Sequence, residues 1–99
     1  KEMKAQRAPS LLQPDGEMEC YLTGVQTGCD LHHIYGGPNR KNSDNWGCWV
    51  WLKHSVHMDL HDRDKTIDKR LKQDCQRAFQ KKYGRAKFVE VFGKNYLDE

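Results

Sequence analysis

The stretch that decides the fold runs from position 31 to position 61 and reads LHHIYGGPNRKNSDNWGCWVWLKHSVHMDLH. It holds all five histidines of the 99-residue chain. It begins with an adjacent pair, His32 and His33, and ends with His57 and His61, which are four positions apart. A segment rich in glycine and asparagine and a short aromatic run lie between the two pairs. This clustering of histidines is the main chemical signal of the sequence.

The second pair lies in a segment, residues 55–62, that we predict to form a short helix with Ser55 as its N-cap. Side chains four residues apart on a helix lie on the same face, close enough to bind one metal ion. His57 and His61 are therefore candidate ligands of a single metal. His54 is expected to cap this helix or to lie on the surface.

The first pair lies near the end of a predicted strand over residues 29–35. Adjacent residues of a strand point to opposite faces of the sheet, so His32 and His33 are not expected to do the same work. One imidazole can join a metal on a facing helix, and the other is left as a base, with a pKa near ~6.5 in its ordinary state. The alternative interpretation of the pair is a partly exposed strand end.

Between the pairs we predict a loop and a strand. Residues 36–47 contain the glycines, proline and asparagines typical of a loop. Residues 48–52, CWVWL, are aromatic and β-branched and favour a strand. Trp49 and Trp51 would share one face of it, with Val50 on the other. The tryptophans are expected in the core rather than as platforms for nucleic-acid bases.

Upstream, residues 18–22 are predicted to pair with residues 29–35 as a hairpin, with turn residues over 23–28. Residues 1–16 are predicted to be a flexible N-terminal arm, and a basic arm that touches phosphates is the alternative. Residues 17–99 would then form the single domain.

Downstream, residues 65–83 are predicted to form a long amphipathic helix. Its apolar stripe recurs every four residues at Ile67, Leu71, Cys75 and Phe79. Gly84 is expected to end this helix. The tail, residues 86–97, is expected to pack back on the domain. Strands followed by helices predict an α+β fold.

Composition and charge limit the partners and the cellular location that we expect for this protein. With 17 basic and 14 acidic side chains, the net charge of +3 permits nucleic-acid binding without demanding it. No stretch approaches the ~20 apolar residues of a membrane span, and no secretory signal is recognised, so a cytoplasmic protein is expected. The four cysteines are expected to be free thiols. A second metal site that joins Cys20 and Cys29 to nearby histidines is an alternative.

The order of a His-His pair, a loop, a strand and a His-x-x-x-His helix resembles the HNH (His-Me finger) endonucleases. The histidine motif resembles most strongly the nuclease domains of bacterial colicins, and the segments GGPNRKNS and FGKNYL are similar to small phage-encoded HNH proteins. The resemblance covers about residues 20–97. It implies a ββα-metal core, to which the long C-terminal amphipathic helix is added.

The same resemblance implies a role for each histidine. His32, His57 and His61 would bind the metal, and His33 would be the general base that activates water. The central asparagine of the family pattern, which steadies the loop that carries the base, falls at Cys48 in this chain. The sequence therefore departs from the family at this position.

The loop between the motif halves supplies the remaining candidate residues. Asn42 or Asn45 would replace the missing asparagine as loop support, and Arg40 and Lys41 would contact substrate phosphates. A second basic cluster that could extend the substrate groove is formed by Lys81, Lys82, Arg85 and Lys87.

These inferences predict a metal-dependent DNA endonuclease or nickase of phage or prophage origin in a bacterial host cell. Three imidazoles suit zinc or nickel, whereas HNH enzymes often use magnesium, so the one divalent ion is Zn, Ni, Mn or Mg. DNA is the expected partner, with a phage or host recombination or packaging protein as a further candidate. The alternatives are a non-catalytic zinc-stabilised DNA-binding module, in which a fourth ligand closes the site, and a degenerate HNH interaction protein.

Overall fold

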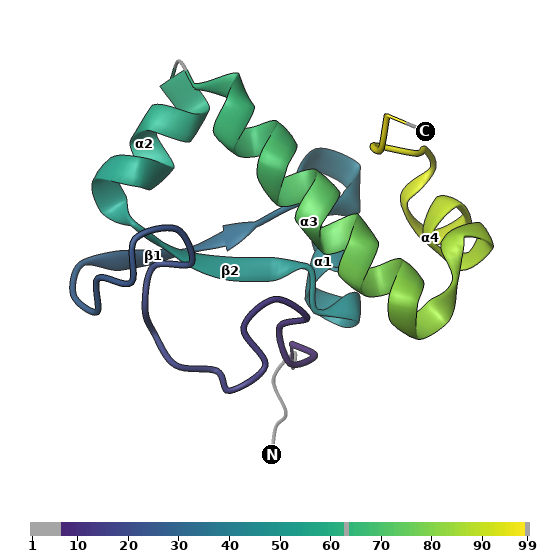
Figure 1. Ribbon diagram of the computed structural model, residues 1–99, viewed down its shortest axis with the longest axis horizontal. Helices are drawn as coiled ribbons and strands as arrows, with labels where there is room; N and C mark the ends of the chain where they lie inside the picture. Colours follow the sequence, from purple (N-terminus) through teal and green to yellow (C-terminus); the bar gives the residue numbers. More distant parts are fainter. Residues whose placement is uncertain (1–6, 63, 99) are drawn as a thin grey trace.

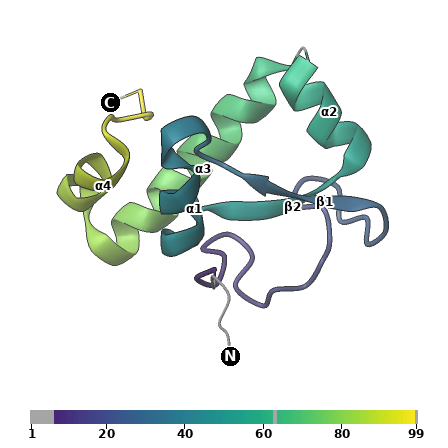
Figure 2. The same cartoon turned by 180° about the vertical axis from the view of Figure 1, so that it is seen from behind.

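A two-stranded antiparallel sheet carries helices on one side and an extended N-terminal segment on the other (Figures 1 and 2). The structure is a computed structural model that describes residues 7–62 and 64–98. In chain order the elements are β1 (Cys29–His33), the 3-10 helix η1 (Gly37–Asn39), α1 (Arg40–Trp46), β2 (Trp49–Lys53), α2 (His54–Asp62), α3 (Lys65–Tyr83) and α4 (Arg85–Phe92). The α+β prediction is confirmed at this level. Within the described residues, no helix is both long and apolar enough to cross a membrane.

The register of the two strands sets which side chains face the helices. His32 pairs with Val50, and Asp30 pairs with Leu52. Paired residues of an antiparallel sheet share a face. Val50 and Leu52 are fully buried, so this face of the sheet contributes to the core. Asp30 and His32 lie on the same face, toward α2.

The predicted hairpin over residues 18–35 is wrong. Residues 18–22 form no strand, and β1 pairs instead with β2, which begins sixteen residues after β1 ends. The outer edge of β2 is occupied by the N-terminal segment, since Tyr21 N–H donates to the Trp51 carbonyl at 2.9 Å. In the run Trp49–Lys53, Trp49, Val50 and Leu52 are buried, so pairing with it removes apolar surface from water.

The N-terminal segment is fastened to β2 by side chains. Ser10 Oγ donates to the Trp49 carbonyl at 2.6 Å, and Trp51 N–H donates to Gln13 Oε1 at 2.8 Å. Ser10 and Gln13 are both buried. This segment belongs to the arm that the sequence predicts over residues 1–16, of which residues 1–6 lie outside the described part of the chain. The hydrogen bonds of Ser10 and Gln13 satisfy an edge that would otherwise be open.

The predicted loop over residues 36–47 is largely helical, so the prediction of a loop is wrong there. Gly47 ends α1 with a left-handed φ of 76°, and its N–H donates to the Ser43 carbonyl. A Cβ at Gly47 would collide with the carbonyl oxygen of Pro9. The glycine thus both ends the helix and lets the N-terminal segment approach.

The long helix was predicted with its observed bounds, Lys65–Tyr83. Asp64 caps it by accepting the Thr66 N–H. Leu71 and Phe79 are fully buried, as the apolar stripe predicted, and Gly84 is the C-cap. The tail packs back as expected, but much of it is helical, as α4. An aromatic cluster joins these elements and consists of Tyr35, Phe79, Phe88, Phe92 and Tyr96.

Candidate metal centre

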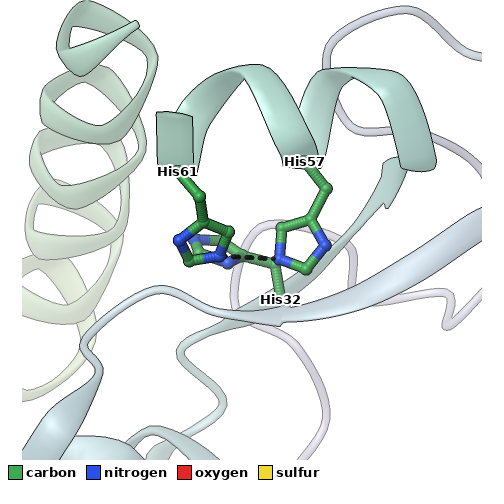
Figure 3. Close-up of side chains that lie close together, drawn as sticks. All are labelled: His32, His57 and His61. Atoms are coloured by element: carbon green, nitrogen blue, oxygen red, sulfur yellow. Dashed lines mark hydrogen bonds between the residues drawn. The ribbon is translucent and has the colours of Figure 1, made fainter. Parts of the chain in front are cut away.

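Three histidines from two elements meet at one point above the sheet (Figure 3). His32 comes from β1, and His57 and His61 come from successive turns of α2. One nitrogen from each imidazole lies within 4.8 Å of the others, and Nε2 of His57 and Nε2 of His61 are 3.2 Å apart. Three imidazole nitrogens at this spacing can share one metal ion.

His32 supplies the clearest sign that this cluster fits a cation. Its side chain is buried, and its Nε2 atom has no hydrogen-bond partner in the described structure. An unpartnered buried nitrogen is costly, and a bound cation would remove that cost. Burial, together with repulsion from His57 and His61 in their charged forms, lowers the pKa of His32 to about 4. His32 is therefore neutral at pH 7 and has a lone pair to offer.

Asp30 orients one of the three imidazoles. Its Oδ2 atom accepts hydrogen bonds from Nδ1 of His57 at 3.0 Å and from Nδ1 of His54 at 2.7 Å. These two bonds, that of His57 first, hold the pKa of Asp30 below its usual range, so the carboxylate is charged. The proton of His57 is thereby kept on Nδ1, and its Nε2 lone pair is directed at the cluster. This is the carboxylate–histidine arrangement that supports metal ligands.

We expect Asp30→Asn to weaken zinc binding by roughly 10–100-fold, because the neutral amide holds the Nδ1 proton of His57 less firmly. Asp30→Ala, which removes the acceptor, is expected to weaken it further. Competition with a chromogenic chelator measures the affinity. Asp62→Asn, the same change at the exposed end of α2, serves as the control and should bind zinc as the wild type does. Equal affinities of Asp30→Asn and the wild type would remove Asp30 from the centre.

His33 lies apart from the three clustered histidines, as its position in the strand predicted. Its Nε2 atom is 2.8 Å from Oδ1 of Asp44, a residue of α1. Arg7 Nε donates to the same oxygen at 3.1 Å. With Nε2–H donating to a carboxylate, the lone pair of His33 resides on Nδ1. The pairing orients His33 in the manner of an aspartate–histidine dyad.

The three clustered histidines and His33 share a cleft of about 280 Å³. His33 and Arg40 line it together with His32, His57 and His61. Lys41 lines an adjoining cleft with Arg7, His33 and Asp44. Arg40 and Lys41 are both exposed, and neither has an ion pair within residues 7–62 and 64–98. The structure thus brings the predicted phosphate-binding residues beside the histidines.

Asn42 and Asn45, which are predicted to support the loop that carries the base, both lie in α1. Asn42 Nδ2 donates to the Val91 carbonyl at 3.1 Å and so ties α1 to the end of α4. Asn45 is exposed and makes no hydrogen bond to a described site residue. The residue that fastens the segment after His33 is Ser43, whose buried Oγ donates to the Tyr35 carbonyl at 2.8 Å and accepts the Tyr35 N–H at 3.1 Å.

At Cys48, where the HNH pattern has asparagine, the backbone contacts Ile34, the residue that follows β1. Ile34 N–H donates to the Cys48 carbonyl at 2.9 Å, and Cys48 N–H donates to the Ser43 carbonyl at 2.8 Å. The thiol itself is buried in the core. All four cysteines are free, as predicted, and none joins the histidine cluster within the part of the chain that the structure describes.

Sequence reasoning missed three residues of the site: Asp30, Asp44 and Arg7. The alternation of a strand could have identified Asp30, because it lies two residues before His32 and so shares its face. No comparable signal existed for Asp44, since α1 was not predicted, or for Arg7, whose partner is 37 residues away.

Comparison of the chain with protein-family models, with curated proteins and with solved structures finds no significant match. The resemblance to the HNH endonucleases therefore stays a prediction that rests on the motifs of the sequence.

Proposed function

We propose that this protein is a metal-dependent endonuclease or nickase that hydrolyses DNA phosphodiester bonds. The observation that carries the proposal is a cluster of three imidazoles that shares its cleft with a fourth histidine oriented by a carboxylate. A ligand set and a separate base are the two parts that hydrolysis needs. β1, β2 and α2 would then be a ββα-metal core.

The number of clustered histidines favours catalysis over a structural zinc site. Structural sites are closed by four protein ligands, whereas catalytic sites keep a position open. Within the described residues the cluster has three members. His54, considered as a fourth ligand, has an exposed side chain and donates to Asp30 instead.

His32, His57 and His61 would hold one divalent ion, which when bound supplies a Lewis acid that stabilises charge on the scissile phosphate. Nδ1 of His33 would accept a proton from water, and the water oxygen would attack phosphorus. The bond from phosphorus to the 3′ oxygen would break, and that oxygen would take up a proton from solvent. The products are a 5′-phosphate and a 3′-hydroxyl.

The other residues of the cleft would position the base and the substrate. Asp44 would hold the imidazole of His33 with its lone pair on Nδ1. Arg40 would contact a phosphate oxygen, because it is exposed and lines the cleft of the histidines. Lys41 would contact the phosphate next along the strand.

A plasmid assay tests the proposal. Supercoiled DNA should be nicked or linearised by the wild type in the presence of magnesium, manganese, nickel or zinc, and chelator should stop the reaction. His57→Ala removes one ligand and should abolish cutting. Met58→Ala, at the adjacent and exposed position of the same helix, should cut normally. If no metal supports cutting of any DNA form, the proposal fails.

A further inference from the structure

An apolar groove of about 480 Å³ lies outside the histidine site, between the N-terminal segment and α3. Pro9 and Leu11 line it from the N-terminal segment, and Ala78 and Tyr83 line it from the C-terminal half of α3. Trp46, the last residue of α1, lines it as well. Trp46 is only half-buried, and Tyr83 is 41% exposed. Two aromatic residues are therefore open to a ligand here.

Lysines accompany both aromatic rings. Nζ of Lys82 lies 5.3 Å from the centre of the Tyr83 ring, and Nζ of Lys87 lies 5.7 Å from the centre of the Trp46 ring. Lys81 lines the groove beside Lys82, and both are exposed. No carboxylate is among the described residues that line the groove. The charge of the groove is thus complementary to an anionic ligand that has flat, apolar parts.

Neighbouring residues of the N-terminal segment line the groove and the cleft that contains His33. Arg7 lines the cleft that contains His33, and the next residue, Ala8, lines the groove. Ala8 N–H donates to the carbonyl of Asp44 at 2.9 Å, which fixes this junction to α1. α1 also contributes to both sites, with Asp44 in the cleft and Trp46 in the groove. This neighbourhood fits a polymer that is bound at the histidines and extends to the groove.

We propose that this groove binds a single strand of nucleic acid, with bases against Trp46 and Tyr83 and phosphates on Lys81 and Lys82. Stacking of bases on aromatic rings, combined with lysines along the backbone, is how sequence-tolerant single-strand sites work. The proposal rests on the proposed function and deepens it: the strand in the groove is an unpaired part of the substrate that is cut at the histidines.

Binding in the presence of EDTA tests this without any cutting. Fluorescence anisotropy would follow a short labelled DNA strand, an RNA strand of the same sequence, the DNA duplex and a glutamate-rich peptide. The double variant Lys81→Ala/Lys82→Ala should weaken single-strand binding roughly tenfold, and the salt dependence of log K should become shallower by about 1.4, which is two phosphate contacts. The DNA and RNA arms identify which strand is preferred.

Three further variants separate charge from stacking. The control Lys69→Ala/Lys94→Ala removes the same charge elsewhere, including a lysine 5.0 Å from the Tyr96 ring, and should bind as the wild type does. Tyr83→Ala should weaken binding about tenfold with little change in the salt dependence, and Tyr83→Phe should restore it. If Tyr83→Ala fails to fold, crosslinking of an iodouracil-labelled strand to Trp46 or Tyr83 gives the same information.

The results separate the two proposals. Loss of single-strand binding in the lysine double variant, without plasmid cutting by the wild type, would uphold the groove and reject the nuclease. Plasmid cutting with single-strand binding equal in the double variant and its control would reject the groove alone. Binding of the glutamate-rich peptide in place of the nucleic acids would also overturn the groove proposal, because it would identify a protein-docking surface.

Discussion

His32→Leu is expected to leave the metal-free protein at least as stable as the wild type and to abolish the stabilisation that zinc provides. His32 is 6% exposed, and its Nε2 atom has no hydrogen-bond partner among the described residues. Replacing an unsatisfied buried polar group with an apolar side chain is neutral or favourable, because the unmade hydrogen bond costs about 1–3 kcal/mol. The variant should therefore unfold at the same temperature as the metal-free wild type or higher.

With zinc bound, the wild type should unfold at a higher temperature than His32→Leu. At ~100 times its dissociation constant, a ligand that binds only the folded state adds about 2.7 kcal/mol. In a domain of this size that raises the melting temperature by roughly 10–20 °C. Calorimetry with EDTA and then with excess zinc measures both quantities. His54→Leu, which removes an exposed imidazole outside the cluster, should keep the zinc-induced shift. A full shift in His32→Leu would show that His32 is not a ligand.

His33→Ala is expected to slow DNA cutting by about 10²–10⁴-fold, the range that a positioned general base contributes. Zinc affinity and melting temperature should stay close to the wild-type values, because His33 lies outside the three-histidine cluster. This combination separates a base from a ligand, since loss of a ligand would reduce both cutting and zinc affinity. Single-turnover nicking of supercoiled plasmid measures the rate.

Asp44 provides the companion variant. Asp44→Asn keeps the size of the side chain but changes what holds Nε2–H of His33, so it should fall between the wild type and His33→Ala in rate. Zinc affinity should again be unchanged. If His33→Ala cuts as fast as the wild type, the assignment of the base is wrong, and Asp44 has no part in the reaction.

Local sequence patterns predicted the helices and strands whose bounds depend on residues close together in the sequence. The bounds of α3 followed from an apolar stripe and a terminal glycine, both of which lie inside the helix or next to it. The strand predicted at residues 48–52 and the helix predicted at residues 55–62 lie within one residue of Trp49–Lys53 and His54–Asp62. Side-chain composition over a short window is enough for such elements.

The same reasoning failed for contacts between residues that are far apart in the sequence. Residues 18–22 read as a strand in isolation, but the partner of β1 is decided by which surface buries the most apolar area. The helix α1 was not predicted because it contains two asparagines, Asn42 and Asn45, and is flanked by glycines and a proline. It forms because Ser43 and Asn42 anchor it to the segment after β1 and to the end of α4, contacts that no local window contains.

The sequence by itself determined the division of the histidines. A strand alternates and a helix repeats near four residues, so His32 had to part from His33, and His57 had to join His61. Only the tertiary structure decided that His32 is buried without a partner and that Asp30 and Asp44 orient His57 and His33. Those properties come from residues brought together across the fold, because burial and charge at a site depend on neighbours in space rather than in sequence.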